Sequence, residues 1–188
     1  IVTARDANTQ AVFSLKGKPL NCYGMRQATV YRNEELYYIT KALGLEDGMD
    51  NLRYEKIVIA TDADVDGLHI RNLLITFFLT FFEELVLSER LYILETPLFR
   101  VRNKRDIIYC YNNAERADAV AKLGKSAEVT RFKGLGEISP DEFGQFIKED
   151  IRLRPVTVES MQYVPEVLRF FMGKNTPERR HYIMQNLM

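Results

Sequence analysis

The sequence lacks the features that identify several common classes of protein. Its 188 residues include only two cysteines, Cys22 and Cys110, which lie far apart and show no CxxC spacing. This excludes a disulfide framework and a cysteine-based zinc site, and it fits the reducing cytosol. The 26 basic residues equal the 26 acidic ones, so net charge gives no global sign of a nucleic-acid partner. Such a partner would have to meet local basic patches.

Long apolar runs are also missing. The longest, residues 73–87, is interrupted by Glu83 and Glu84, and it is too short and too polar to span a bilayer. No stretch resembles a signal peptide, an internal repeat or a low-complexity segment. We therefore expect a cytoplasmic protein without a membrane partner. Because the first residue is Ile1 rather than Met, we also expect a piece of a longer polypeptide.

The apolar patterns that are present predict an α/β fold. The continuous run at 57–60 is typical of a strand covered on both faces, as in a parallel sheet flanked by helices. A helix at 67–85 and a strand at 91–95 follow, and a strand at 12–15 and a helix at 33–43 precede them. This alternation predicts parallel pairing with right-handed crossovers. The core-facing stripe of the long helix is expected to consist of Ile70, Leu73, Leu74, Phe77, Phe78, Phe81 and Leu85.

Beyond Pro97 the pattern changes to a mixed α+β tail. A basic stretch, RVRNKR at 100–105, precedes a predicted strand at 107–111 and a helix at 113–123. Arginines in this stretch could contact phosphates, and a charged strand edge explains them equally well. We place a domain boundary near residue 99, which gives two predicted segments, 1–99 and 100–188.

Capping signals predict where several helices begin and end. Asn33 is a suitable N-cap and Gly44 a suitable residue after the last turn. Ser139 and Glu142 form a capping-box pattern around Pro140, and Thr176 begins a last helix in the same way.

Three aspartates, Asp62, Asp64 and Asp66, follow the buried strand within five positions. Their charges repel, so the cluster requires either protonation or a bound cation. Carboxylate oxygens suit a hard ion such as Mg²⁺, and ligands bind at the carboxyl ends of strands in parallel sheets. Alternation in an extended segment would put Asp62 and Asp64 on the same side. The sequence therefore predicts a magnesium site here.

Other interpretations of the triplet remain. Asp66 could simply cap the following helix. The pattern also matches the first six positions of a calcium-binding EF-hand loop, but Leu73 stands where that loop needs a glutamate, and a strand rather than a helix precedes it. A phosphatase with an aspartyl-phosphate nucleophile would need a lysine and further acids that we cannot identify.

Four motifs resemble one protein family. TDADVDGLHIRNLL at 61–74 is similar to the metal-binding strand, loop and helix of the Toprim fold in type IIA DNA topoisomerases. RFKGLGE at 131–137 and LKGKPLN at 15–21 resemble segments of the bacterial B-type subunits, and LETPLFRV at 94–101 also fits. The motifs occur in the family's order and span nearly the whole chain. The resemblance implies a Toprim, Rossmann-like parallel sheet.

The resemblance also implies a reaction. Such enzymes cut both strands of one double-stranded DNA, pass a second duplex through and reseal the cut, driven by ATP hydrolysis elsewhere in the subunit. The nucleophile is a tyrosine of the partner A-type subunit. By motif, Asp62 and Asp64 would be catalytic Mg²⁺ ligands, with Asp66 as the third acid of the metal site. Tyrosines of this chain are not expected to cleave DNA.

One departure from the family pattern is large. The family's Toprim domain opens with an EGDSA motif whose glutamate is a metal ligand, and that motif is absent. We expect it just upstream of Ile1, and we expect the ATP-binding domain outside this segment too, so the isolated chain should not cleave DNA. The bulky insertion that some gyrase B subunits carry before RFKGLGE is missing, and together with the segment DGLHI this favours the B-type subunit of topoisomerase IV over that of gyrase. A metal-assisted module that binds DNA and a partner subunit is a further alternative, whereas the motifs argue against a Toprim primase or nuclease.

Basic residues near these motifs are the candidates for DNA contact. Lys16 and Lys18 flank a glycine in a predicted loop, which could instead be merely solvated. Two glycines follow Arg131 and Lys133 and allow close approach to DNA or to a neighbouring chain. Two further candidates lie on the helix after the acids, where a plain surface or packing role is the alternative: His69 and Arg71.

Overall fold

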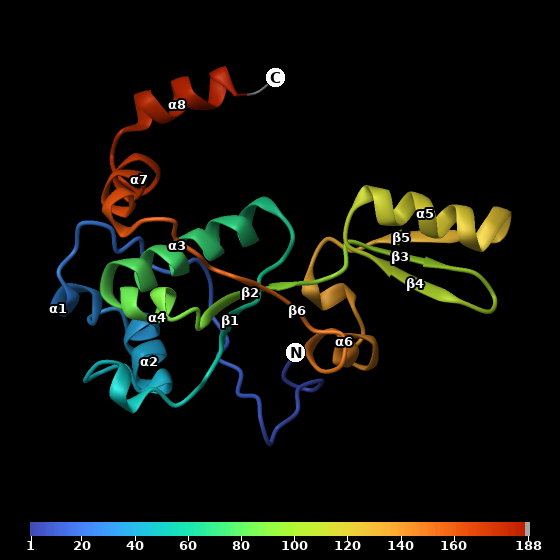
Figure 1. Cartoon of the computed structure of the whole chain (residues 1–188), viewed down its shortest axis with the longest axis horizontal. Coiled ribbons are helices and arrows are strands. Elements are labelled where there is room, and N and C mark those ends of the chain that lie inside the picture. The colour runs from blue at the N-terminus through green and yellow to red at the C-terminus, as the bar shows by residue number, and fades with distance from the viewer. Residues whose placement is uncertain (187–188) are drawn as a thin grey trace. The chain divides into compact units, whose positions relative to one another are not determined.

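The computed structural model describes residues 1–186 and divides them into two compact units whose segments interleave along the chain (Figure 1). The first unit contains residues 1–12, 58–69 and 93–154, and the second contains 13–57, 70–92 and the chain from residue 155 onward. The division into units does not follow the boundary predicted near residue 99, which remains a prediction about domains. The mixed α/β class predicted from the sequence is confirmed.

A three-stranded antiparallel sheet in the first unit carries one helix on its face. β3 lies in the middle, between β4 and β5, and Phe99 of β3 is paired with Cys110 on one side and Arg131 on the other. Phe99, Val101 and Cys110 are buried together with Ala119 of α5. Along β3 the buried residues alternate with more exposed ones, because successive side chains of a strand point to opposite faces. The elements are β3 (Phe99–Arg102), β4 (Ile107–Cys110), α5 (Asn113–Leu123) and β5 (Glu128–Arg131).

The second sheet has the order β1-β2-β6. Its first two strands were predicted, whereas its third is formed by residues of the predicted tail. The strand predicted at 12–15 is wrong: these residues form no strand, and Phe13 is 46% exposed. A short apolar segment without a neighbouring strand does not become a β-strand, because its backbone N–H and C=O groups find no hydrogen-bond partners there. The strands are β1 (Ile57–Ile59), β2 (Leu91–Glu95) and β6 (Arg152–Pro155).

The long helix predicted at 67–85 is two helices. α3 (Val65–Phe81) ends before Phe82, whose backbone leaves the helical region at φ −141°, and α4 (Glu83–Leu87) follows. The predicted stripe is otherwise correct, since most of its members are buried. The rings of Phe77 and Phe82 lie 5.4 Å apart, edge to face. Packing of Phe82 beside Phe77 accompanies the break that periodicity alone did not predict.

Two of the predicted helix caps, Asn33 and Ser139, are confirmed. The side chain of Asn33 accepts a hydrogen bond from the Leu36 amide at 3.0 Å, and Gly44 ends the helix at φ 76°. The cap of the last helix is Asn175 rather than Thr176. No helix formed by the described residues is long and apolar enough to cross a membrane. These helices are α1 (Gln27–Val30), α2 (Glu34–Leu43), α6 (Pro140–Ile147), α7 (Val164–Met172) and α8 (Thr176–Gln185).

Candidate metal and nucleic-acid site

The acidic triplet spans the loop after β1 and the first turn of α3, and all three aspartates are exposed. Oδ1 of Asp64 accepts a hydrogen bond from the Gly67 amide at 2.7 Å and so satisfies one of the free N–H groups of the first helical turn. Because α3 begins at Val65, Asp66 lies inside that turn. The capping role considered for Asp66 therefore belongs to Asp64.

Asp62 is held by a loop that lies 73 positions away in the sequence. Its Oδ1 accepts a hydrogen bond from the Leu135 amide at 2.7 Å, and Leu135 begins a single 3₁₀ turn at Leu135–Glu137. Asp62 and this loop belong to the same compact unit. The structure thus brings together two motifs that lie far apart in the sequence.

Two glycines make this close approach possible. A Cβ atom added at Gly134 would lie 3.2 Å from Oδ1 of Asp62, which is tighter than ordinary packing allows. A Cβ atom at Gly67 would lie 2.0 Å from the backbone oxygen of Asp62. Gly136, by contrast, has nothing within 4 Å of such an atom. The sequence predicted close approach to DNA or another chain at Gly134, and the structure places Asp62 of this chain there.

The donor set of Asp62 and Asp64 fits a hard divalent ion. One oxygen of each carboxylate accepts a hydrogen bond from a backbone amide. One or two carboxylates are the usual protein contribution to a Mg²⁺ site, whose other ligands are water and phosphate. The described residues contain no group of three or more His, Cys, Asp or Glu side chains able to hold a metal.

Three of the predicted DNA-binding residues belong to the same unit as the acids. Arg131 is the last residue of β5, Lys133 begins the loop that reaches Asp62, and His69 lies on α3. All three are exposed. The backbone amide of Lys133 donates to Oε2 of Glu137 at 3.0 Å, and this bond closes the loop. The Lys133 side chain itself is exposed.

The other three predicted DNA-binding residues, Lys16, Lys18 and Arg71, belong to the second unit. The loop that carries Lys16 is held by a hydrogen bond, in which the backbone amide of Lys16 donates to Oε1 of Glu35 at 2.6 Å. Arg71 is half-buried, whereas both lysines are exposed. The candidate site of the first unit therefore does not include these three residues.

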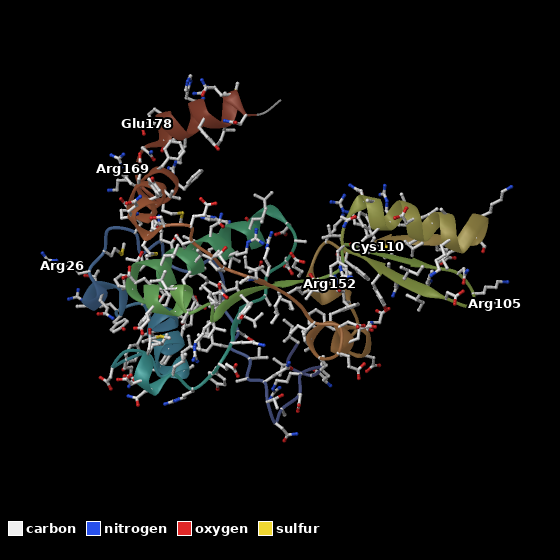
Figure 2. All side chains as sticks on the ribbon, in the orientation of Figure 1. Arg26, Arg105, Cys110, Arg152, Arg169 and Glu178 are labelled. Carbon is white, nitrogen blue, oxygen red and sulfur yellow. The ribbon has the colours of Figure 1, made fainter. Side chains whose placement is uncertain are left out.

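The basic stretch after β2 has mostly structural contacts. Arg100 forms a half-buried ion pair with Glu142 at 2.6 Å, and Arg102 pairs with Glu128 at 3.1 Å on the surface. Arg105 lies at the tip of the β3–β4 hairpin and points outward (Figure 2). Of the two explanations left open by the sequence, strand charges that pair within the protein are the better supported for Arg100 and Arg102.

A hydrogen-bonded group around Glu142 escaped prediction from the sequence. Oε1 of Glu142 accepts from Arg100 and, at 2.8 Å, from the hydroxyl of Tyr109, while Oε2 accepts from Ser139 at 3.1 Å. Partial burial raises the pKa of the Glu142 carboxyl, but these three donors outweigh burial and hold that pKa below its ordinary value. Burial and the bond to Glu142 raise the pKa of Tyr109 to about 12. The capping box was the only local signal that involved Glu142.

Two parts of the chain match known protein families. Residues 1–96 match the Toprim domain family, and residues 124–184 match the family described as DNA gyrase B subunit, carboxyl terminus. The chain belongs to the Toprim family and, by its carboxyl-terminal match, to the B-type subunits of type IIA DNA topoisomerases.

Individual relatives agree with this assignment. The chain is 57% identical over 189 residues to the B subunit of DNA topoisomerase 4 of Borreliella burgdorferi, with 100% of this chain and 32% of the relative covered. It is 37% identical over 187 residues to the B subunit of DNA gyrase of Archaeoglobus fulgidus, with 96% of this chain and 29% of the relative covered. The chain thus spans about a third of the length of these relatives.

A solved structure has the same fold. The DNA-binding, cleavage and re-ligation domain of Plasmodium falciparum topoisomerase II superposes with a TM-score of 0.76 at 26% identity. The match covers 93% of this chain and 25% of that one.

Proposed function

We propose that this chain is the Mg²⁺-binding part of an ATP-dependent type IIA DNA topoisomerase that cleaves, passes and religates double-stranded DNA. The single observation that supports this most is the hydrogen bond between Asp62 and the Leu135 amide. It joins the acidic triplet to the loop of residues 132–138 within one compact unit. Family membership supports the same proposal.

In this proposal Asp62 and Asp64 hold the metal through their second carboxylate oxygens. The bound ion would act as a Lewis acid beside the scissile phosphate and would neutralise charge on the leaving 3′ oxygen. Leu135 orients Asp62 through its amide, and Gly67 keeps Asp64 in place by donating to Oδ1. Asp66 is the third acid at this edge, and its charge adds to the field that attracts a cation.

Six basic side chains would contact the DNA backbone. Arg131, Lys133 and His69 lie in the unit that carries the acids, and Lys16, Lys18 and Arg71 belong to the other unit. Arginine and lysine side chains bind phosphate oxygens without reading sequence, so these residues would position a duplex rather than select one.

The remaining parts of the reaction would come from elsewhere. We propose that an A-type subunit supplies the nucleophilic tyrosine, that ATP binds another part of the full-length protein, and that the enzyme works in the cytoplasm. Topoisomerase IV is preferred to gyrase, since the relative of that name has the higher identity of the two compared, 57% against 37%. By itself this chain would bind metal, DNA and the partner subunit without cleaving DNA.

The metal assignment is tested with Mn²⁺ as a spectroscopic probe of the 188-residue chain. Asp62→Asn and Asp64→Asn should each weaken Mn²⁺ binding, measured by electron paramagnetic resonance, at least about ten-fold. Asp47→Asn is the matched control, because Asp47 is exposed in a turn of the second unit. Equal Mn²⁺ affinity for the wild type and the Asp62 and Asp64 variants would refute the site.

A further inference from the structure

Arg100 is an unusual arginine because its charge is only partly solvated. Its side chain is 20% exposed, and its Nε is buried without a hydrogen-bond partner among the described residues. The guanidinium carbon lies 5.7 Å from the centre of the Phe132 ring, a cation–π distance. It forms an ion pair with Glu142, so an ionic contact and an aromatic contact help to hold this group in place.

Glu142 receives donors from two strands and from the N-cap of its own helix. Arg100 comes from β3, Tyr109 comes from β4 and Ser139 precedes α6. Charged hydrogen bonds in partly desolvated surroundings are strong and directional. Glu142 therefore ties the start of α6 to the antiparallel sheet.

The loop that reaches Asp62, residues 132–138, has a buried residue at each end. Phe132 is 5% exposed, and its amide donates to the Leu98 oxygen at 2.9 Å just before β3. Ile138, at the other end of the loop, is also 5% exposed and packs in the same core cluster as Phe132. Arg100 contacts Phe132 directly, and Glu142 belongs to α6, the helix that follows Ile138. Between them, Leu135 presents its amide to Asp62.

We propose that Arg100 and Glu142 are positioning residues for Asp62, acting through the loop of residues 132–138. Their ion pair fixes both ends of the loop and thereby keeps the Leu135 amide on Oδ1 of Asp62, which leaves the second oxygen for the metal. The meaning of this for catalysis rests on the proposed metal-binding role of Asp62. The positioning itself is a property of this chain and is measured without metal.

The test compares Arg100→Gln with Arg102→Gln. Both arginines lie on β3, and Arg102 pairs with Glu128 where the two side chains are 47% and 70% exposed, so the second variant is a matched control. Native-state hydrogen exchange of the Leu135 amide, followed by NMR, reports the hydrogen bond to Asp62. The Gly67 amide, which donates to Asp64, is the internal reference.

We expect Arg100→Gln to accelerate exchange of the Leu135 amide about ten-fold and Arg102→Gln to leave it unchanged, with the Gly67 amide unaffected in both. Unchanged Leu135 exchange in a folded Arg100→Gln chain would overturn the proposal, as would equal acceleration at the Gly67 amide, which indicates general loosening. Should Arg100→Gln not fold, Tyr109→Phe removes one hydrogen bond from the same Glu142 oxygen, and the same two amides decide the outcome.

The metal experiment separates this inference from the proposed function. Positioning of Asp62 predicts that Arg100→Gln also weakens Mn²⁺ binding, by about ten-fold, whereas Arg102→Gln does not. If wild-type chain binds no Mn²⁺, the proposed metal site fails while the Leu135 exchange result still decides the positioning role. If Mn²⁺ binds equally to wild type and Arg100→Gln, the link from the loop to the metal is refuted.

Discussion

At Gly67 the chain passes too close to itself for any side chain. An added Cβ atom would lie 2.0 Å from the backbone oxygen of Asp62, so Gly67→Ala must displace the turn that carries the acids. We expect a loss of about 2 kcal/mol in the free energy of unfolding, measured by urea denaturation. Gly136→Ala is the control and should cost less than about 0.5 kcal/mol, because nothing lies within 4 Å of that position. Equal losses for both variants would contradict the packing argument.

The cysteines are residues of the core rather than reactive groups. Cys22 and Cys110 are both fully buried, and burial raises the pKa of Cys22 to about 11 and also raises the pKa of Cys110. Because the thiolate is the reactive form, we expect both thiols of the native chain to react with a chromogenic disulfide reagent far more slowly than those of the urea-unfolded chain. Rapid labelling of either thiol in the folded chain would contradict their burial.

Among the elements, the junction of α6 with the antiparallel sheet depends on one carboxylate. Glu142→Ala leaves the Arg100 charge without its ion pair in a half-buried position, where the two side chains are 20% and 22% exposed. We expect a loss of about 2 kcal/mol, below the cost at a fully buried pair because solvent screens this one. Urea denaturation measures it. The exposed Arg102–Glu128 pair supplies the control, and Glu128→Ala should cost less than about 0.5 kcal/mol.

The same junction should respond to acid. The folded pKa of Glu142 lies below its ordinary value of 4.5, so the unfolded chain takes up a proton first as the pH falls. The stabilisation is therefore fully present above about pH 5 and is lost as the pH falls through the folded pKa. We expect the difference in unfolding free energy between wild type and Glu142→Gln to shrink between pH 6 and about pH 3. A difference that stays constant over this range would contradict the assignment.

For the whole molecule, net charge of zero makes the placement of cations decisive for DNA binding. The double variant Arg131→Gln, Lys133→Gln should weaken duplex binding and lower the slope of log affinity against log salt by about 2, since two phosphate contacts are lost. Fluorescence anisotropy at several salt concentrations measures both quantities. Lys122→Gln with Lys125→Gln changes the charge equally at exposed positions around the end of α5 and should leave the slope unchanged. Equal slopes for the two double variants would contradict the proposed interface.

At the same scale, we expect the isolated chain to leave supercoiled plasmid DNA unrelaxed even with an A-type subunit and Mg²⁺ present. The chain spans 32% of the topoisomerase 4 relative, and the proposed reaction needs an ATP-binding part as well. Agarose gel electrophoresis of the plasmid decides this. Relaxation that disappears in the Asp62→Asn chain would show that this piece is active by itself.

Local chemistry allowed much of the molecule to be predicted. The caps at Asn33 and Ser139 were correct because a cap depends on residues three or four positions apart. The strand at 57–59 followed from its apolar run and the stripe of α3 from its periodicity. The expectation that this strand is covered on both faces is wrong, because Val58 is 37% exposed. The acidic triplet marked the candidate site because clustered like charges are relieved by protonation or by a bound cation.

Only the tertiary structure decided which distant groups meet. The bond from Leu135 to Asp62 joins residues 73 positions apart, and no local pattern reports such a contact. Arg100, which the sequence offered to phosphate or to a strand edge, pairs with Glu142 because folding brings β3 against α6. The break at Phe82 likewise depends on packing. The sequence alone determined which residues form the candidate site and its local turns, since these depend on neighbouring residues, whereas the orientation of Asp62 depended on long-range contacts that exist only in the folded chain.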